Sequence, residues 1–207
     1  MAVRTFPESP QNRGGRAVPK PSKREDLLAS ALETFHTRGF HGTGIKEIAD
    51  AAGAPKGSFY NHFSSKEECA IEALRLFGNE RRLDMLADPD SPPLERIRRH
   101  FEFLRDEVVV RDFTRGCMFG NFATDVVDHS EEIRAAVAQS LGTWSSALTA
   151  ALTEARRDGA VRADLDPDTT ARFLLNAWEG TLIEARATKS SVAFDTFFLM
   201  AFEAVLR

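Results

Sequence analysis

The chain has 207 residues, of which 43% are hydrophobic, and its formal net charge is −4 at pH 7. This composition provides enough apolar side chains for a real core in one domain or two small ones. The two cysteines, Cys69 and Cys117, lie too far apart to suggest a disulfide framework, and no apolar stretch is long enough to span a bilayer. Because the sequence also begins without an apolar signal segment, we expect a cytoplasmic protein with no membrane partner.

The charge is distributed unevenly along the chain. Residues 1–66 carry ten Lys and Arg against six Asp and Glu, whereas residues 67–207 carry 17 against 25. A basic N-terminal part on an acidic body is typical of a DNA-binding head that does not draw the whole protein onto phosphate.

Residues 1–21 combine four prolines, a Gly14–Gly15 pair and four basic residues, and this composition predicts a disordered basic arm. The alternative for this arm is a segment that enters the minor groove of DNA, as the arms of homeodomains do. The first helix is predicted to begin at Ser22, where Glu25 completes a capping box, and to end at Gly39.

The segment 43–66, TGIKEIADAAGAPKGSFYNHFSSK, predicts two short helices joined by a tight turn. Apolar residues recur in it at helical spacing, Gly53 stands where the turn favours a positive φ, and Pro55 opens the second helix. In a helix-turn-helix, the second helix lies in the major groove with its N-terminal residues at the base edges. The segment therefore predicts DNA binding.

Nine residues of this segment are candidates for DNA contacts. Their basic, hydroxyl, amide and imidazole groups suit phosphates or base edges, and the glycine allows close approach. These candidates are Thr43, Lys46, Lys56, Gly57, Ser58, Tyr60, Asn61, His62 and Lys66. Thr43 is also expected to cap the first helix of the motif. Phe59 and Phe63, four residues apart, are expected to be core residues that hold the second helix.

A fourth helix, capped by Ser64 and Glu67, is predicted to run to about Met85 and to connect the head to the body. Beyond the break at 88–93, no window alternates as a strand would, and the 116–127 segment favours no single structure. Helices are predicted over 94–109, 131–158, 167–187 and 192–206. The predicted fold is all-α, with a three-helix helix-turn-helix domain over 22–68 and a helical ligand-binding and dimerisation domain over 69–207.

The run GFHGTGIKEIADAAGAPKGSFYNHFSSKEE resembles the DNA-binding signature of the TetR family of bacterial transcriptional regulators. The resemblance is strong over residues 22–80, and the body resembles the family only in the number and length of its helices. Pro55 departs from the pattern, since many members have Ser or Thr there. The resemblance implies an Ω-shaped homodimer that represses a promoter through operator DNA and releases it when a small-molecule inducer binds the body.

A second resemblance involves residues 116–121, Gly-Cys-Met-Phe-Gly-Asn. This segment is similar to the Gly-Cys-x-x-Gly-Asn segment of a TetR subgroup that includes regulators responding to reactive electrophiles and to acrylate. It implies an inducer of that kind near Cys117.

Aromatic side chains crowd the segment around Cys117, and two tryptophans lie on later helices, which suits either an apolar ligand pocket or an ordinary core. Cys117 is either a packing residue or a sensor. Cationic neighbours, with Arg111 and Arg115 nearby, or a helix N-terminus would lower its pKa and favour the thiolate. The candidates for ligand contacts are Cys117, Asn121, Phe101, Phe119, Trp144 and Trp178.

Apolar stripes on the last two helices suit either a protomer core or a twofold four-helix interface between two copies, and the resemblance favours the interface. The candidates for this interface are Phe173, Ala177, Phe197, Phe198, Ala201 and Phe202.

The competing class is a helical small-molecule-binding protein or thiol enzyme with a vestigial helix-turn-helix. Asp125 and His129 could share a helix face as metal ligands, and Cys117 could be a nucleophile paired with His100. The sequence contains no third metal ligand nearby, no Gly-rich phosphate loop and no nucleophile elbow. We therefore expect no enzyme, no metal and no cofactor.

Overall fold

The computed structural model describes residues 22–207, and within that range it contains helices and no strand, which confirms the all-α prediction. The predicted basic arm, residues 1–21, lies outside the described residues. The helical elements are α1 (Lys23–Arg38), α2 (Ile45–Ala51), α3 (Lys56–Phe59), α4 (Lys66–Asn79), η1 (Leu83–Ala87), α5 (Pro93–Val110), α6 (Met118–Asp125), α7 (Glu131–Arg157), α8 (Pro167–Thr188), α9 (Val192–Leu199) and η2 (Met200–Val205).

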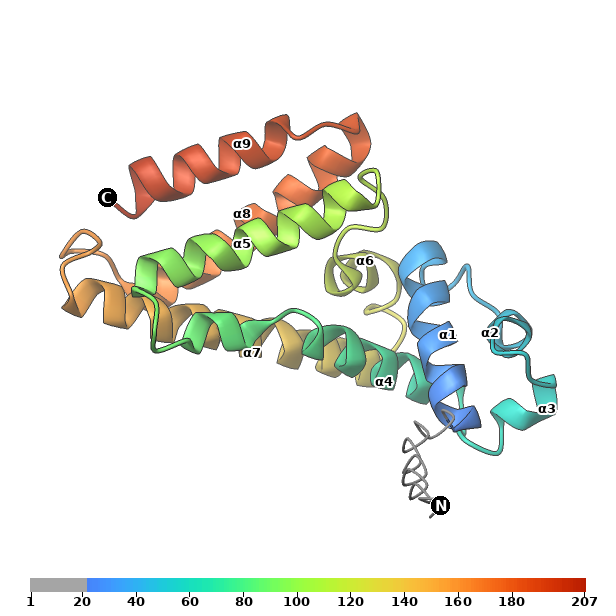
Figure 1. Cartoon of the computed structure of the whole chain (residues 1–207). Helices are drawn as coiled ribbons and strands as arrows, with labels where there is room; N and C mark the ends of the chain where they lie inside the picture. Colours follow the sequence, from blue (N-terminus) through green and yellow to red (C-terminus); the bar gives the residue numbers. More distant parts are fainter. Residues whose placement is uncertain (1–21) are drawn as a thin grey trace, which may run out of the picture.

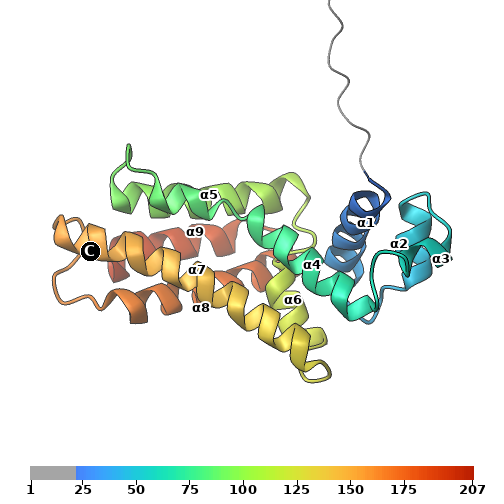
Figure 2. The same cartoon turned by 90° about the horizontal axis from the view of Figure 1, so that it is seen from below.

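Helices α1, α2 and α3 form a head at one end of the molecule, and α4 extends from this head along the body (Figure 1). In the body, α5, α7, α8 and α9 run along its length, as the second view also shows (Figure 2). The short α6 lies between α7 and the head and contacts α1, α4 and α7. It therefore connects the body to helix α1 of the head.

Several helix ends follow from local chemistry. The Ser22 hydroxyl accepts a hydrogen bond from the Glu25 amide, and the Glu25 carboxylate accepts one from the Ser22 amide at 2.8 Å, so the predicted capping box is present. Gly39 ends α1 with a φ of 74°, and Asp166 caps α8 by accepting from the Thr169 amide at 2.8 Å. These boundaries agree with the sequence prediction.

The fourth helix differs from the prediction at both ends. Ser65, rather than Ser64, caps α4, because its hydroxyl accepts from the Glu68 amide at 3.0 Å. The helix ends at Asn79 instead of continuing to Met85, since the chain turns at Arg82 with a φ of 51°. A separate 3₁₀ turn, η1, then leads to α5, so the link from head to body is shorter than predicted.

Two aromatic clusters form the core. In the head, the Phe59 and Phe63 rings lie 5.3 Å apart, and both side chains are buried. In the body, the Trp178 ring lies 5.1 Å from Phe101 and 5.0 Å from Phe197. These clusters make both parts of the molecule rigid supports for the surfaces described below.

Candidate functional site

The recognition segment, residues 55–63, comprises α3 and the turn after it. Phe59 and Phe63 are 0% and 1% exposed, which confirms that they belong to the core. With these two side chains turned inward, the remaining residues of the segment face outward. Lys56, Gly57, Asn61 and Tyr60 are exposed, and Tyr60 retains 54% of its surface.

The outward side chains of the recognition segment are not engaged in polar contacts within the described residues. Lys56, Tyr60, Asn61 and the half-buried His62 form no side-chain hydrogen bond or ion pair with residues 22–207, and Ser58 beside them is also half-buried. A Cβ built on Gly57 would meet no atom within 4 Å, so nothing within the described fold requires glycine there. These features suit a surface that receives an external partner.

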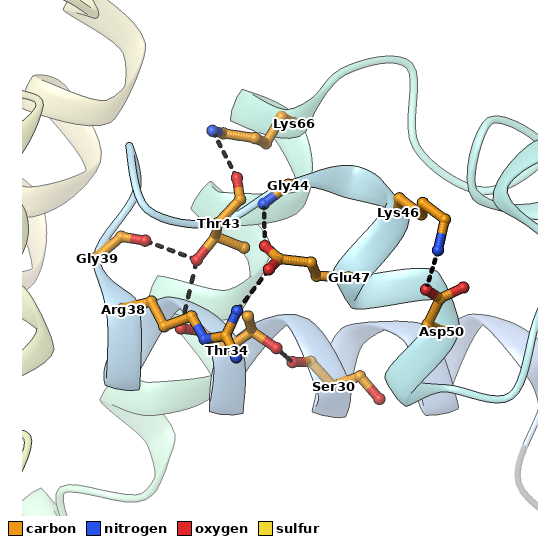
Figure 3. Close-up of polar contacts among 10 residues, drawn as sticks. All are labelled: Ser30, Thr34, Arg38, Gly39, Thr43, Gly44, Lys46, Glu47, Asp50 and Lys66. Carbon is orange, nitrogen blue, oxygen red and sulfur yellow. Dashed lines mark hydrogen bonds and ion pairs between the residues drawn. The ribbon is translucent and has the colours of Figure 1, made fainter.

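Thr43 differs from its prediction (Figure 3). Its side chain is 2% exposed, and its hydroxyl donates to the Gly39 carbonyl at 2.7 Å, so the hydroxyl is not free for phosphate. It also does not cap α2, because Gly44 is the N-cap and its amide donates to Glu47 at 2.8 Å. Lys46 is exposed as predicted and pairs with Asp50 at 2.5 Å.

Lys66 has partners within the protein that the sequence did not predict. Its ammonium donates to the Thr43 carbonyl at 2.9 Å (Figure 3). It also donates to the Phe40 carbonyl at 2.8 Å and lies 4.1 Å from the centre of the Phe40 ring. Partial burial lowers the pKa of Lys66. The ammonium of Lys66 thus holds the loop before α2 against the start of α4, and the phosphate contact predicted for Lys66 stays a prediction.

A cavity of about 200 Å³, named here the inner cavity, lies where α1, α4, α5, α7 and α8 meet the loop before α6. Three of the predicted ligand residues, Cys117, Trp144 and Trp178, line it together. Phe101 does not line it and is a buried core residue, and Phe119 lines a separate open groove beside α4 and α7.

Of the titratable groups that line the inner cavity, sequence reasoning singled out only Arg111 and Arg115. These groups come from four separate parts of the chain, so no local pattern could bring them together. They are Glu33, His36, Glu80, Arg81, Glu107, Arg111 and Arg115. The cavity therefore combines an aromatic wall with groups that suit a polar or charged ligand.

Cys117 is the N-cap of α6 and separates the inner cavity from a second cavity of about 270 Å³, named here the outer cavity. Glu179, Arg186 and Asn121 line the outer cavity. The prediction that cationic neighbours lower the pKa of Cys117 is wrong. Burial, and then the Glu179 carboxyl, raise the pKa of the Cys117 thiol well above its usual value.

Asn121 is engaged within the protein. Its amide donates to the Arg115 carbonyl at 2.7 Å, and its oxygen accepts from Arg186 at 3.0 Å. Arg186 also donates to the Arg115 carbonyl at 3.2 Å. Asn121 thus supports the loop that precedes Cys117, although it also lines the outer cavity.

The 111–117 loop, residues Arg111 to Cys117, connects the cavities to the head. His36 of α1 bonds to the Gly116 carbonyl at 2.8 Å, and Arg115 donates to Glu33 of the same helix at 2.8 Å. Burial lowers the pKa of His36 to about 4, so the ring is neutral at pH 7. These two bonds connect the loop directly to α1.

The other end of α6 also contacts the head. The Asp125 carboxylate accepts hydrogen bonds from the backbone amides of Phe40 and His41, at 2.6 and 3.2 Å. Asp125 is thus a link between α6 and the loop before α2. Residues 22–207 contain no group of three or more His, Cys, Asp or Glu that could hold a metal ion. The imidazole of His100, the other residue of the rival interpretation, accepts from Trp144 at 3.0 Å instead of contacting Cys117.

The outer face of α8, α9 and η2 corrects part of the predicted interface. Phe197, Ala201 and Phe202 are at most 5% exposed and pack inside the protomer, so their side chains do not lie on that face. Phe173 is 51% exposed as predicted, and Ala177 and Phe198 are half-buried. Sequence reasoning missed the exposed apolar residues on this face, which are Ile183, Val192, Leu199 and Met200.

Residues 22–207 also contain no helix that is long and apolar enough to cross a membrane.

Comparisons with known proteins agree with this geometry. Residues 27–73 match the family model described as "Bacterial regulatory proteins, tetR family", and residues 93–200 match "Tetracyclin repressor-like, C-terminal domain". The chain is 30% identical over 186 residues to the HTH-type transcriptional repressor DhaR of Mycobacterium sp. (strain GP1). That alignment covers 88% of this chain and 92% of the relative.

Two solved structures extend the comparison to three dimensions. The regulatory protein TetR from Rhodobacter sphaeroides superposes with a TM-score of 0.82 at 27% identity, over 87% of this chain and 97% of the other. The reduced form of Escherichia coli NemR superposes with a TM-score of 0.78 at 25% identity, over 89% and 97%.

Proposed function

Because this chain belongs to the TetR family of bacterial regulatory proteins, we propose that it is a ligand-responsive transcriptional repressor. In this proposal, the head binds operator DNA, and a small molecule that binds the body releases it. The head is the helix-turn-helix domain over residues 22–68, and the ligand-binding and dimerisation body is residues 69–207. The single observation that carries the proposal is the recognition segment, whose outward side chains have no partner among residues 22–207.

The DNA contacts are proposed for the outward residues of the recognition segment. Lys56 would neutralise a phosphate, Gly57 would let the DNA approach the backbone, and Tyr60 and Asn61 would reach base edges or thymine methyl groups. Ser58 and His62 complete this surface at its half-buried edge, and Lys46 lies beside it on α2. Thr43 and Lys66 contribute by holding the two helices of the motif in place.

Homodimerisation is proposed through the outer face of α8, α9 and η2. Phe173, Ile183, Leu199 and Met200 expose apolar surface on it, and an isologous twofold contact would bury this surface. Gly180, on α8, supports the same face, because a Cβ there would meet no atom within 4 Å. A glycine with open space beside it inside a helix allows a partner helix to approach closely.

The proposed coupling between ligand and DNA passes through the 111–117 loop. Asp112, Phe113 and Arg115 adopt positive φ angles of 52°, 53° and 69°, a conformation that is strained for residues other than glycine. Contacts to α1, α6 and α8 hold the loop in this conformation. A ligand in the inner cavity would compete with these contacts, shift α1 and α4, and spoil the match of two heads to half-sites about 34–36 Å apart.

The inducer is proposed to be a small electrophile or an acrylate-like acid that binds beside Cys117. The thiol lies between two cavities, and Arg111 and Arg115 line the inner one. A guanidinium group is suited to a carboxylate, and a thiol is suited to an activated double bond. The similar Escherichia coli protein NemR was solved in a form described as reduced.

Operator binding tests the proposed function directly. The purified protein is titrated into labelled DNA from upstream of its own gene at fixed salt, with random DNA as competitor, and fluorescence anisotropy is recorded. Saturable nanomolar binding that resists the competitor is expected. Affinity no higher than for random DNA, for this and for neighbouring promoter fragments, would contradict the proposal.

The same complex tests the coupling. Spin labels on the two heads report their separation with and without an inducer found by release of the DNA. A separation that stays fixed when the inducer binds would refute the proposed change in spacing, although it would leave repression itself intact.

A further inference from the structure

The Cys117 thiol and the Glu179 carboxyl form a buried pair between α6 and α8. Both side chains line the outer cavity, and atoms of both lie within 4.0 Å of a Cβ built on Gly120. A Cβ built on Gly120 would lie 2.3 Å from Glu179 Oε2, so glycine at this position is what lets the carboxylate approach α6. The other oxygen, Oε1, is buried and has no hydrogen-bond partner among the described residues. The proposed DNA and dimer contacts give this pair no role.

The surroundings of the pair suit a proton transfer. The backbone of Phe119 and Gly120, in the first turn of α6, acts to lower the pKa of the Cys117 thiol and so favours the thiolate, against the larger effect of burial. Glu179 lies on the other side as the acceptor for the proton. Groups that favour the thiolate and a base are thus both in place at a sulfur that lines two cavities.

The resting thiol does not supply a useful fraction of free thiolate. Burial and the Glu179 carboxyl raise the pKa of Cys117 well above its usual value, and burial raises the pKa of Glu179. The raised pKa of Cys117 keeps the resting sulfur protonated, and the raised pKa of Glu179 makes its carboxylate a stronger base for that proton. The other titratable groups that line the two cavities are Glu33, His36, Glu80, Arg81, Glu107, Arg111, Arg115 and Arg186.

We propose that Glu179 is the base that takes the Cys117 proton when a neutral α,β-unsaturated carbonyl compound adds to the sulfur. This role rests on the proposed covalent sensing. The sulfur forms a bond to the β-carbon, the thiol proton moves to the Glu179 carboxylate, and the double-bond electrons move onto the carbonyl oxygen. The α-carbon then takes the proton back from Glu179, so that the product is a thioether and the carboxylate is restored.

The pair also determines which electrophiles react. The ionised Glu179 that takes the proton repels a ligand carboxylate held next to it, whereas it does not repel a neutral enone, enal or imide. This preference narrows the proposed inducer class to neutral electrophiles for covalent capture. An acid would then act without forming the thioether.

The test measures the rate at which N-ethylmaleimide, a neutral Michael acceptor, modifies each cysteine of the full-length protein. Peptide mass spectrometry separates Cys117 from Cys69, which is buried in α4 with its pKa raised to about 12 and serves as an internal reference for opening of the fold. The test variant is Glu179→Gln, which keeps the shape of the side chain and removes the base. Glu184→Gln, on the exposed side of the same helix, is the matched control.

The expected result is that Glu179→Gln slows modification of Cys117 at pH 7 by roughly 10² or more, while Glu184→Gln leaves the rate unchanged. In the unmodified sequence the rate should be nearly flat between pH 6.5 and 8.5. In Glu179→Gln it should rise about tenfold per pH unit, because only free thiolate can then react. Equal or faster reaction of Glu179→Gln, with Cys69 unchanged, would overturn the proposal and show that the carboxylate only suppresses the thiol.

Two further readouts separate this inference from the proposed function. If Cys117 reacts as expected but operator DNA stays bound, covalent sensing fails and the base role stands. If Cys117 of the unmodified sequence reacts no faster than Cys69, the base role fails, while repression and noncovalent release are still measured by anisotropy.

Discussion

The recognition segment and the cavity walls use their polar side chains in opposite ways. Lys56, Tyr60 and Asn61 face outward with no partner among residues 22–207, whereas Asn121 and Arg186 are bound to each other and to the 111–117 loop. Unpaired groups gain contacts when a partner arrives, but paired groups must exchange contacts before anything changes. The head is thus built to bind, and the body is built to respond.

The largest effect is expected from the buried side of the recognition segment. Phe59→Ala removes a fully buried ring and should lower the free energy of unfolding by about 3–5 kcal/mol, with loss of operator binding. Its neighbour Tyr60 is 54% exposed, so Tyr60→Ala should change stability by less than about 0.5 kcal/mol. Tyr60→Ala should nevertheless weaken operator binding by about 1–3 kcal/mol if the residue contacts a base.

Urea unfolding and fluorescence anisotropy measure the two quantities separately. A large stability loss in Tyr60→Ala, or full operator affinity in that variant, would show that the outward face of the segment is not the binding surface.

The next largest effect is a loss of folding stability at low pH, which originates in the body. Burial lowers the pKa of His100 to about 4, and its imidazole accepts a hydrogen bond from Trp144. The unfolded chain therefore binds more protons between pH 6.5 and about 4, so stability is complete above pH 6.5 and falls as the pH drops through this range. At pH 5, this group alone should lower the free energy of unfolding by about 2 kcal/mol.

His100→Gln tests this origin, because glutamine still offers an acceptor to Trp144 but does not titrate. The loss of stability between pH 7 and pH 5, measured by urea unfolding, should shrink by about 2 kcal/mol in this variant. His62→Gln, in the recognition segment, is the matched control. If His100→Gln were as acid-sensitive as the unmodified sequence, burial of His100 would not be the cause.

A smaller effect distinguishes two lysines of the head. Lys66 donates to the carbonyls of Phe40 and Thr43, so Lys66→Met should lower the free energy of unfolding by about 1–3 kcal/mol by removing two charge-assisted hydrogen bonds. It should not change how operator affinity depends on salt. Lys56→Ala should leave stability nearly unchanged and reduce the slope of log affinity against log salt by about 0.9 per head.

Anisotropy titrations at several salt concentrations give both slopes. A reduced slope in Lys66→Met would restore the phosphate contact that the sequence predicts for this residue.

These contrasts show which features a sequence can specify. The Ser22 capping box and the Gly39 and Asp166 boundaries depend on groups within a few residues of each other, and all were predictable. The hydrogen bonds of Lys66 were not predictable, because one of its acceptors, the Thr43 carbonyl, lies 23 residues away in the chain. The same holds for Glu179, whose partner Cys117 is on a different helix.

The prediction of the interface residues was partly wrong for another reason. The last helix is apolar on most of its circumference, with Phe197, Phe198, Leu199 and Met200 in succession. The hydrophobic periodicity of its sequence therefore does not indicate which face is buried. Packing against Trp178 and Phe101 decides it, and Phe197 lies inside while Leu199 and Met200 face outward. A helix that is apolar all round needs its tertiary neighbours before its faces can be assigned.

The smallest expected effect has opposite signs for folding and for binding. A Cβ built on Gly57 meets no atom within 4 Å, and the same is true of Gly142 in α7. Alanine at either position should raise the free energy of unfolding by about 0.5–1 kcal/mol, since both glycines lie within helices. Only Gly57→Ala should weaken operator binding, because the added methyl group occupies the surface to which DNA is proposed to bind.

Each variant adds one methyl group. Thermal unfolding measures the stability of the two variants, and anisotropy measures their affinity for operator DNA. Equal operator affinity for Gly57→Ala and Gly142→Ala would mean that the DNA does not approach the recognition segment at Gly57. A weaker complex for Gly57→Ala alone, in a protein that has become more stable, cannot come from damage to the fold. It would therefore assign the loss to the interface itself, and it would show that the head keeps glycine at this position for its partner, at the expense of its own stability.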